Sequence, residues 1–461
     1  MIFSSTIFLF IFLPAVLLLN YIIPKKYVGA KNIVLLIASL FFYAWGEPKN
    51  VLLMLLSIVV NYVCGILLGK FEGNDKKRKL VLVISVVFNL GLLFYFKYFN
   101  FFTGGIFPTI ALPIGISFFT FQIMSYTIDV YRHDVAPQKN VLTLALYISL
   151  FPQLIAGPIV RYIDVEKQLQ YRECTAEKTA RGMIRFSMGL AKKVIISNTV
   201  AVICDGIFTI SNTLPSVTAW VGAITYALQI YFDFSGYSDM AIGMGHMLGF
   251  DFLENFNYPY VSTSVQEFWR RWHISLSSWF RDYLYIPLGG NRKGKLRTYI
   301  NLIIVFACTG FWHGASFSFI VWGLYHGFFL VIERLGFGKA LKKIPKIFGW
   351  LYTMLVVLIG WVFFRADTLS AAMTYIGSMF SFSGGLANAM AQFSNLSFAI
   401  TVIAIILSAP VYPFIKSKIE KTETGRRVGF ILESVIALAL LVLSVLFLTG
   451  SDYNPFIYFR F

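Results

Sequence analysis

The chain has 461 residues, of which 57% are hydrophobic, and its mean hydropathy is +0.71. This composition excludes a soluble globular domain and predicts a protein that crosses a membrane several times. The formal net charge of +17 would suggest a nucleic-acid partner for a soluble protein, but the basic residues here form short clusters between apolar runs, so we expect no nucleic-acid partner.

Apolar runs long enough to cross a bilayer recur along the chain. The clearest are residues 4–23, 51–69, 80–96, 398–415 and 429–449. A hydrocarbon core of roughly 30 Å needs about 20 apolar residues, and further, less regular runs lie between these. We therefore predict an all-α polytopic membrane protein with about ten to twelve transmembrane or re-entrant helices. We see no second domain and treat residues 1–461 as one.

Three basic clusters predict how the helices are oriented. They are residues 76–79, 292–297 and 416–427. Short loops rich in lysine and arginine stay in the cytoplasm and attract anionic lipid headgroups. We expect all three loops to face the cytoplasm and membrane lipids to be partners.

The first unusual polar positions lie in "QIYFDFSGYSDMAIG", which begins at Gln229. Asp233 and Asp239 stand there in otherwise apolar surroundings. Carboxylates within a membrane can orient a histidine, bind a cation or relay protons, whereas the simpler explanation is helix capping near Gly236. The sequence leaves these alternatives open.

The stretch "VQEFWRRWHISLSSWFRDYLY", from Val265, has the 3.6-residue period of one helix. Its aromatic residues fall on one side, and Arg270, His273 and Arg281 belong to a narrow polar stripe on the other. Two interpretations are about equally good: a functional face that presents His273 between arginines, or an interfacial helix whose arginines meet lipid phosphates and whose His273 is solvated.

The stretch "GFWHGASFSF" places His313 between glycines in an apolar run, and His326 follows 13 residues later. On one straight helix the two rings would be about 20 Å apart on different faces. Either Gly310 and Gly314 break the helix around His313, or only one histidine has a chemical role. An ionisable ring within a membrane usually faces a cavity or a partner.

The simpler alternative for His313 is a neutral imidazole in a packed core. A tryptophan precedes a histidine twice, however, as Trp272 before His273 and Trp312 before His313. This repetition favours a functional role for both histidines.

These segments resemble the membrane-bound O-acyltransferase family, in particular its bacterial branch of alginate and other exopolysaccharide O-acetyltransferases. The resemblance runs through nearly the whole chain and several long motifs occur in one order. They are "FSSTIFLFIFLP", "LPIGISFFTFQIMSYTIDVYR", "FPQLIAGPIVR", "QIYFDFSGYSDMAIG", "FWRRWHISLS", "GFWHG", "WGLYHG" and "WVFFRA".

The resemblance implies a many-helix fold around a tunnel, with the family's active-site histidine at His313, its second polar position at His273 and a further family histidine at His326. Family members take an acyl group from a cytoplasmic donor to a hydroxyl or to an extracytoplasmic partner. We therefore expect a multi-pass protein of the bacterial plasma membrane, with acetyl-CoA or another acyl thioester as donor, an SGNH-type acetyltransferase as partner, and neither a bound cofactor nor a metal.

The chemistry fits these residue types. Acyl transfer from a thioester to an alcohol needs a base for the hydroxyl proton, which imidazole can supply near neutral pH, and a stabilised oxyanion. We predict His313 as the base and His273 as the group that positions donor or acceptor. The predicted donor-binding or supporting residues are Arg270, Arg281, Trp312, His326 and Asp233.

Two other functions compete with this prediction. A D-alanyl transferase for teichoic acids shares the same fold and histidine motifs. A proton-coupled transporter could use Asp233, Asp239 and the histidines as a relay, but the halves show no matching pair of interrupted helices.

Overall fold

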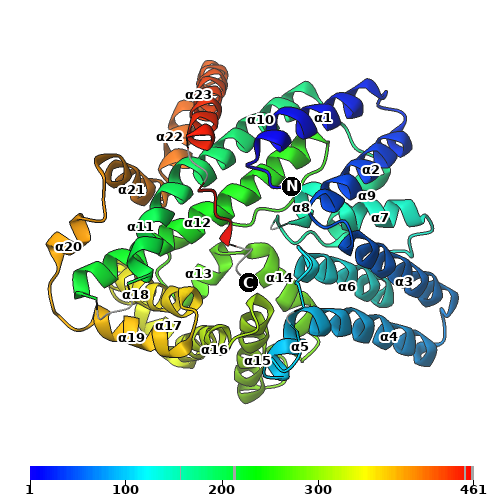
Figure 1. The fold of residues 1–461 in the computed structure, drawn as a ribbon. Helices are drawn as coiled ribbons and strands as arrows, with labels where there is room; N and C mark the ends of the chain where they lie inside the picture. Colours follow the sequence, from blue (N-terminus) through cyan, green and yellow to red (C-terminus); the bar gives the residue numbers. More distant parts are fainter. Residues whose placement is uncertain (109, 156, 211–213, 451–452, 458–461) are drawn as a thin grey trace. The chain divides into compact units, whose positions relative to one another are not determined.

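A computed structural model describes residues 1–108, 110–155, 157–210, 214–450 and 453–457. Within these ranges the regular structure is entirely helical, which confirms the predicted all-α fold (Figure 1). The chain forms two compact units, one of Met1–Phe186 with Tyr237–Glu254 and one of Ser187–Gly236 with Asn255–Phe461. Two of the three boundaries fall inside helices α10 and α12, and the third lies in the segment between α12 and α13. The single-domain assignment stays a prediction.

The first unit contains the N-terminal helices. They are α1 (Leu13–Ile22), α2 (Val28–Gly46), α3 (Asn50–Lys70), α4 (Asp75–Leu93), α5 (Phe99–Phe102), α6 (Ile116–Arg132), α7 (Val141–Ser149), α8 (Phe151–Leu154), α9 (Tyr162–Gln170) and most of α10 (Ala176–Ala191). A π-helical turn, Phe8–Phe12, directly precedes α1, and another, Phe94–Tyr98, joins α4 to α5.

The second unit contains most of the remaining helices. They are α11 (Asn198–Phe208), α12 (Ser216–Met247, in part), α13 (Val265–Arg271), α14 (Ile274–Phe280), α15 (Lys295–His313), α16 (Phe317–Ile332), α17 (Gly338–Leu341), α18 (Lys346–Arg365), α19 (Leu369–Met379), α20 (Leu386–Met390), α21 (Asn395–Leu407), α22 (Val411–Ile419) and α23 (Glu423–Thr449). A 3-10 turn, Pro259–Val261, precedes α13, and π-helical turns cover Lys192–Ser197, Arg281–Tyr285 and Glu333–Phe337.

Seven helices of the described residues are long and apolar enough to cross a membrane. They are Val28–Gly46, Asn50–Lys70, Asp75–Phe102, Ala176–Phe208, Phe317–Leu341, Lys346–Arg365 and Glu423–Thr449. The predicted run 398–415 is bent by 64° between α21 and α22, and this pair would make an eighth span. The chain is therefore a multi-pass membrane protein, in which the other described helices are too short or insufficiently apolar to count as full spans.

Buried amides and hydroxyls join the long helices of the first unit. Where α3, α4 and α6 lie side by side (Figure 1), Asn61 and Asn89 exchange side-chain hydrogen bonds of 2.8 and 3.2 Å. Ser85 donates to Asn61 at 2.7 Å and contacts the Thr127 hydroxyl at 3.0 Å. Polar side chains of this kind hold apolar helices together where the hydrophobic effect does not distinguish helix from lipid.

Helices α15 and α16 form a tight hairpin in the second unit because glycines face each other across it. A Cβ atom added to Gly310 would lie 2.2 Å from the carbonyl oxygen of Phe319. A Cβ atom added to Gly323 would lie 2.2 Å from the carbonyl oxygen of Phe306. Helix α15 ends at His313, where Gly314 adopts an extended backbone. Of the two alternatives for His313 and His326, the structure shows the break, which lies after His313, and the glycines allow the close approach of α16.

The predicted single helix over 265–285 is wrong. Helix α13 stops at Arg271, Trp272 is extended, and His273 has φ 44° and ψ 54°, so α14 starts afresh at Ile274. A left-handed conformation at a residue other than glycine is uncommon and is maintained by the surrounding structure. The break turns His273 away from the polar stripe that the uninterrupted period predicts.

A buried carboxylate fixes the start of α13. Glu333 accepts hydrogen bonds from the backbone N–H groups of Val265 at 2.6 Å and Gln266 at 3.0 Å. Both groups belong to the first turn, which has no intrahelical acceptors and carries a partial positive charge. Glu333 thus ties the short helix that leads to His273 to the end of α16.

Candidate functional site

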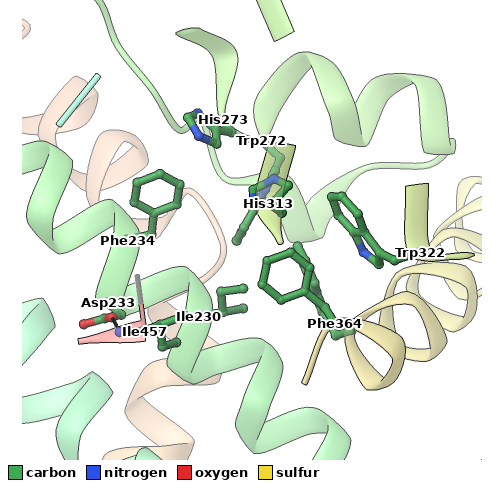
Figure 2. A pocket seen from close by; sticks show the side chains of 10 residues that line it. Ile230, Asp233, Phe234, Trp272, His273, His313, Trp322, Phe364 and Ile457 are labelled. Atoms are coloured by element: carbon green, nitrogen blue, oxygen red, sulfur yellow. Dashed lines mark hydrogen bonds between the residues drawn. The ribbon is translucent and has the colours of Figure 1, made fainter. Parts of the chain in front are cut away.

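A pocket in the second unit is lined by residues from α12, the α13–α14 break, α15, α16, α18 and the C-terminal segment (Figure 2). Its lining consists of Ile230, Asp233, Phe234, Trp272, His273, His313, Trp322, Trp361, Phe364 and Ile457. As the side chains stand, the space that they enclose is small, about 20 Å³. A largely apolar lining with two imidazoles and one carboxylate suits a small acyl group and a few directed polar contacts.

His313 occupies the last turn of α15 and has 7% of its surface exposed. Aromatic rings surround it edge to face: Trp312 at 5.0 Å, Trp322 at 5.1 Å and Phe364 at 5.1 Å between ring centroids. Such packing leaves the ring few rotamers and shields it from lipid and water. His313 is therefore held at the wall of the pocket and faces a cavity, as expected for an ionisable ring in an apolar run.

His273 also lines the pocket and is almost completely buried, with 1% of its surface exposed. The interpretation as a solvated histidine on an interfacial helix is therefore wrong. Its ring meets Phe234 edge to face at 4.6 Å and Trp312 at 6.3 Å, so Trp312 contacts both histidines. Burial lowers the pKa of His273 to about 3, and the ring is neutral near pH 7.

Asp233 reaches the pocket from α12 and pairs with Lys193 at 2.7 Å. The same carboxylate accepts a hydrogen bond of 3.0 Å from the backbone N–H of Ile457, itself a lining residue (Figure 2). The Lys193 ammonium also donates to the carbonyl of Pro455 and, at 2.9 Å, to the side chain of Asn198. Asp233 thus holds the C-terminal segment at the pocket wall.

His326 is fully buried but does not belong to the lining set. Its ring contacts Trp269 at 5.2 Å and Trp322 at 5.3 Å, and a Cβ at Gly360 would lie 2.6 Å from its Nε2 atom. The structure places His326 behind Trp322, where it can support the wall. Any direct role in donor binding stays a prediction.

Arg270 and Arg281 are exposed and lie outside the pocket lining. Arg281 makes a bidentate contact with Asp282, with Nε–Oδ1 and Nη2–Oδ2 distances of 2.6 and 2.9 Å. The structure does not bring the two arginines together with the histidines. Their role in donor binding stays a prediction.

Several lining or supporting residues were not among the predicted site residues. They are the lining residues Ile230, Phe234, Trp272, Trp322, Trp361, Phe364 and Ile457, and the supporting residues Lys193 and Asn255. Lys193 and Asn255 show no local motif, since each acts through a partner more than 15 positions away. Phe364 lies within the "WVFFRA" segment, one of the motifs of the family resemblance, and this motif could have identified it as a site residue.

Comparison with known proteins gives a family match over residues 40–366, to the membrane-bound O-acyltransferase family. The chain is 41% identical over 492 residues to the "Probable alginate O-acetylase AlgI" of Pseudomonas putida, with 100% of both chains covered. It is 36% identical over 525 residues to the "Peptidoglycan O-acetyltransferase" of Helicobacter pylori, with 100% of this chain and 98% of the relative covered. The "Teichoic acid D-alanyltransferase" of Bacillus subtilis is 29% identical over 251 residues, with 52% of this chain and 62% of the relative covered.

Proposed function

Since the chain belongs to the membrane-bound O-acyltransferase family, we propose that its histidine pocket transfers an acetyl group for the O-acetylation of a cell-surface or secreted polysaccharide. The observation that carries the assignment of the site is the buried pocket lined by both His273 and His313. The full-length similarity to polysaccharide O-acetyltransferases supports the reaction class.

In the proposed reaction, the oxygen of an acceptor hydroxyl attacks the thioester carbonyl while His313 takes the hydroxyl proton. The tetrahedral intermediate then collapses, the carbon–sulfur bond breaks, and the thiolate leaves with the proton from the imidazolium. A neutral imidazole suits this base role at pH 7. Exclusion of water by Trp312, Trp322 and Phe364 limits hydrolysis of the thioester in competition with transfer.

The proposed donor is acetyl-CoA or another acyl thioester that reaches the pocket from the cytoplasm. We propose an extracytoplasmic SGNH-type acetyltransferase as the partner that places acetate on the polymer. The small, largely apolar pocket favours an acyl group as small as acetyl over a sugar unit at the histidines. The acceptor hydroxyl at His313 therefore belongs to a group that is narrow enough to enter the pocket.

D-alanylation of teichoic acid is the nearest alternative. The D-alanyltransferase of Bacillus subtilis matches only about half of this chain, whereas the Pseudomonas putida and Helicobacter pylori O-acetyltransferases match all of it. A D-alanyl group carries an ammonium, for which Asp233 is the carboxylate of the pocket lining. Asp233, however, already pairs with Lys193. The full-length similarity favours acetate as the transferred group.

The transporter alternative receives no support from the carboxylates. Asp233 pairs with Lys193 in the second unit, and Asp239 pairs with Arg185 at 2.8 Å in the first. Each carboxylate is thus already held in an ion pair with a cationic side chain.

The function can be tested by analysing the surface polymers of a deletion strain with and without the wild-type gene. Ester-linked acetate and D-alanine are both released by mild alkali and quantified from the same cells. We expect the gene to restore acetate and leave D-alanine unchanged. Restoration of D-alanine without acetate would overturn the proposal.

A further inference from the structure

The side-chain oxygen of Asn255 makes several polar contacts, one of them with His273. Asn255 has 1% of its surface exposed, and its Oδ1 atom lies 3.1 Å from the Nδ1 atom of His273. The same oxygen accepts hydrogen bonds from the backbone N–H of Ser275 at 3.2 Å and from the Ser275 hydroxyl at 2.9 Å.

The contact with Ser275 settles which atom of the amide faces His273. A backbone N–H can only donate, so the atom opposite it is the amide oxygen, and an amide oxygen can only accept. The Nδ1 atom of His273 must therefore carry a proton to bond with it. In a neutral imidazole the lone pair then resides on Nε2.

We propose that Asn255 is a positioning residue that holds His273 as the neutral tautomer with its proton on Nδ1 and its lone pair on Nε2. This inference rests on the proposed acyl transfer for its catalytic meaning. In that reaction His273 accepts a hydrogen bond or a proton, from the acceptor hydroxyl or from an N–H of the donor. It does not donate to the oxyanion, which other donors must stabilise.

The backbone around Asn255 supports the same role. Its carbonyl accepts from the N–H of Ile274 at 2.9 Å, and the N–H of Asn257 donates to the Arg271 carbonyl at 2.9 Å. These bonds brace both sides of the α13–α14 break, where His273 has its left-handed backbone. Asn255 thus fixes the position of the ring as well as its protonation.

Two charged residues described near the ring have ion-pair partners of their own. Asp233 from α12 lines the same pocket, but it pairs with Lys193 at 2.7 Å. Arg271 on α13 pairs with Glu267 at 2.9 Å, and His313 on α15 is the other titratable group of the lining. The amide oxygen of Asn255, 3.1 Å from Nδ1, determines the tautomer of His273.

Nitrogen NMR of histidine-labelled protein in lipid nanodiscs tests the tautomer without any activity. The chain has five histidines, and His273→Gln identifies the resonances of His273 by their loss. We expect a protonated Nδ1 and an unprotonated Nε2 from pH 6 to pH 8. Asn255→Asp should keep this tautomer, whereas Asn255→Leu should give a mixture. Protonation on Nε2 in the wild type, or the same single tautomer in Asn255→Leu, would overturn the proposal.

Acetyl transfer tests the catalytic meaning, with Ser275→Ala as the matched control because it removes a different bond to the same oxygen. We expect Asn255→Leu to lower kcat on the order of 10- to 100-fold with little change in KM, as misplacement of a catalytic group does, and Ser275→Ala to stay near wild type. If the wild type transfers acetate and Asn255→Leu matches its kcat, the positioning role fails. If the wild-type protein shows no acetyl transfer, the result refutes the proposed function instead.

The Asn255→Asp variant provides a pH signature that a purely structural residue would not give. A carboxylate beside Nδ1 favours the imidazolium and raises the pKa of His273. Because the reaction needs the neutral ring, activity on the acid side should be lost at a higher pH than in the wild type. This variant also keeps the proposal testable if Asn255→Leu does not fold, since an unchanged pH profile would contradict it.

Discussion

Lys193 and Asp233 form an ion pair whose side chains are only 1% and 2% exposed. Such a pair persists where further hydrogen bonds satisfy both groups, since transfer of charges from water into the protein is costly. Here the additional partners are Asn198, Pro455 and Ile457, two of which belong to the C-terminal segment. The pair therefore couples the stability of the second unit to the shape of the pocket.

Loss of one member of this pair should be more harmful than loss of both charges. Lys193→Met leaves the Asp233 carboxylate buried without its cation, which we expect to destabilise the protein by about 3–5 kcal/mol. In the Lys193→Met/Asp233→Asn double variant, the amide oxygen still accepts from Ile457 and no charge is buried. The thermal midpoint in detergent should fall for the single variant and recover in part for the double. Equal midpoints for Lys193→Met and wild type would contradict this account of the pair.

The helix elements position the site through their ends. Helix α15 delivers His313 at its last turn, α16 places Trp322 against it, and Glu333 ties the start of α13 to the end of α16. The hairpin is close enough for these contacts because Gly310 and Gly323 have no side chain. The pocket geometry depends on this hairpin as a unit.

Gly310→Ala should therefore be disruptive although alanine favours helices. Its Cβ would lie 2.2 Å from the Phe319 carbonyl oxygen, a backbone atom that cannot rotate away, and overpacking of this kind costs about 1–3 kcal/mol or more. Gly377→Ala in α19 is the control, because nothing lies within 4 Å of its added Cβ. We expect a lower thermal midpoint and lost acetylation only for Gly310→Ala. Full activity of that variant would show that the hairpin can separate without harm.

Sequence periodicity anticipated some elements and missed others for identifiable reasons. Long apolar runs predicted α3, α4 and α23, and the glycine after His313 predicted the end of α15. The α13–α14 break was missed because Trp272 and His273 are neither glycine nor proline, and the bonds from Asn255 and Asn257 that stabilise it come from outside the helix. A pattern of period 3.6 does not contain such partners.

The same limit applies to the site. Both histidines of the pocket were predicted from their apolar context and from the paired tryptophans, and both line it. Ile457 and Lys193 were not, since their roles arise from contacts with Asp233 more than 30 positions away. Long-range contacts of this kind are set by the assembled fold and leave no periodic signal.

At the scale of the whole molecule, the basic clusters predict a topology. In the cluster at 76–79, Lys77 is exposed, whereas Arg78 is 4% exposed and donates to the carbonyls of Val130 and Tyr131 at 3.2 and 2.7 Å. Arg78 thus has a structural role, and the remaining cations supply the orientation signal. The positive-inside rule places all three clusters in the cytoplasm.

This topology can be tested with single cysteines at exposed basic positions, Lys77, Arg292 and Arg426, in a background without the native cysteines. A membrane-impermeant maleimide should not label them in intact cells and should label all three in inside-out vesicles. Labelling of any one of them from outside the cell would contradict the predicted orientation of that loop.

The central claim is that the histidine pocket carries out the acyl transfer, and one comparison tests it most directly. Ester-linked acetate on the surface polymer is measured in the deletion strain that carries wild type, His313→Ala or His133→Ala at matched membrane levels. His133 is the control because it is exposed and lies outside the pocket. We predict that wild type and His133→Ala restore acetate and that His313→Ala restores almost none, because the base for the hydroxyl proton is lost. Equal acetate in all three strains would show that His313 only packs the core and that the chemistry lies elsewhere.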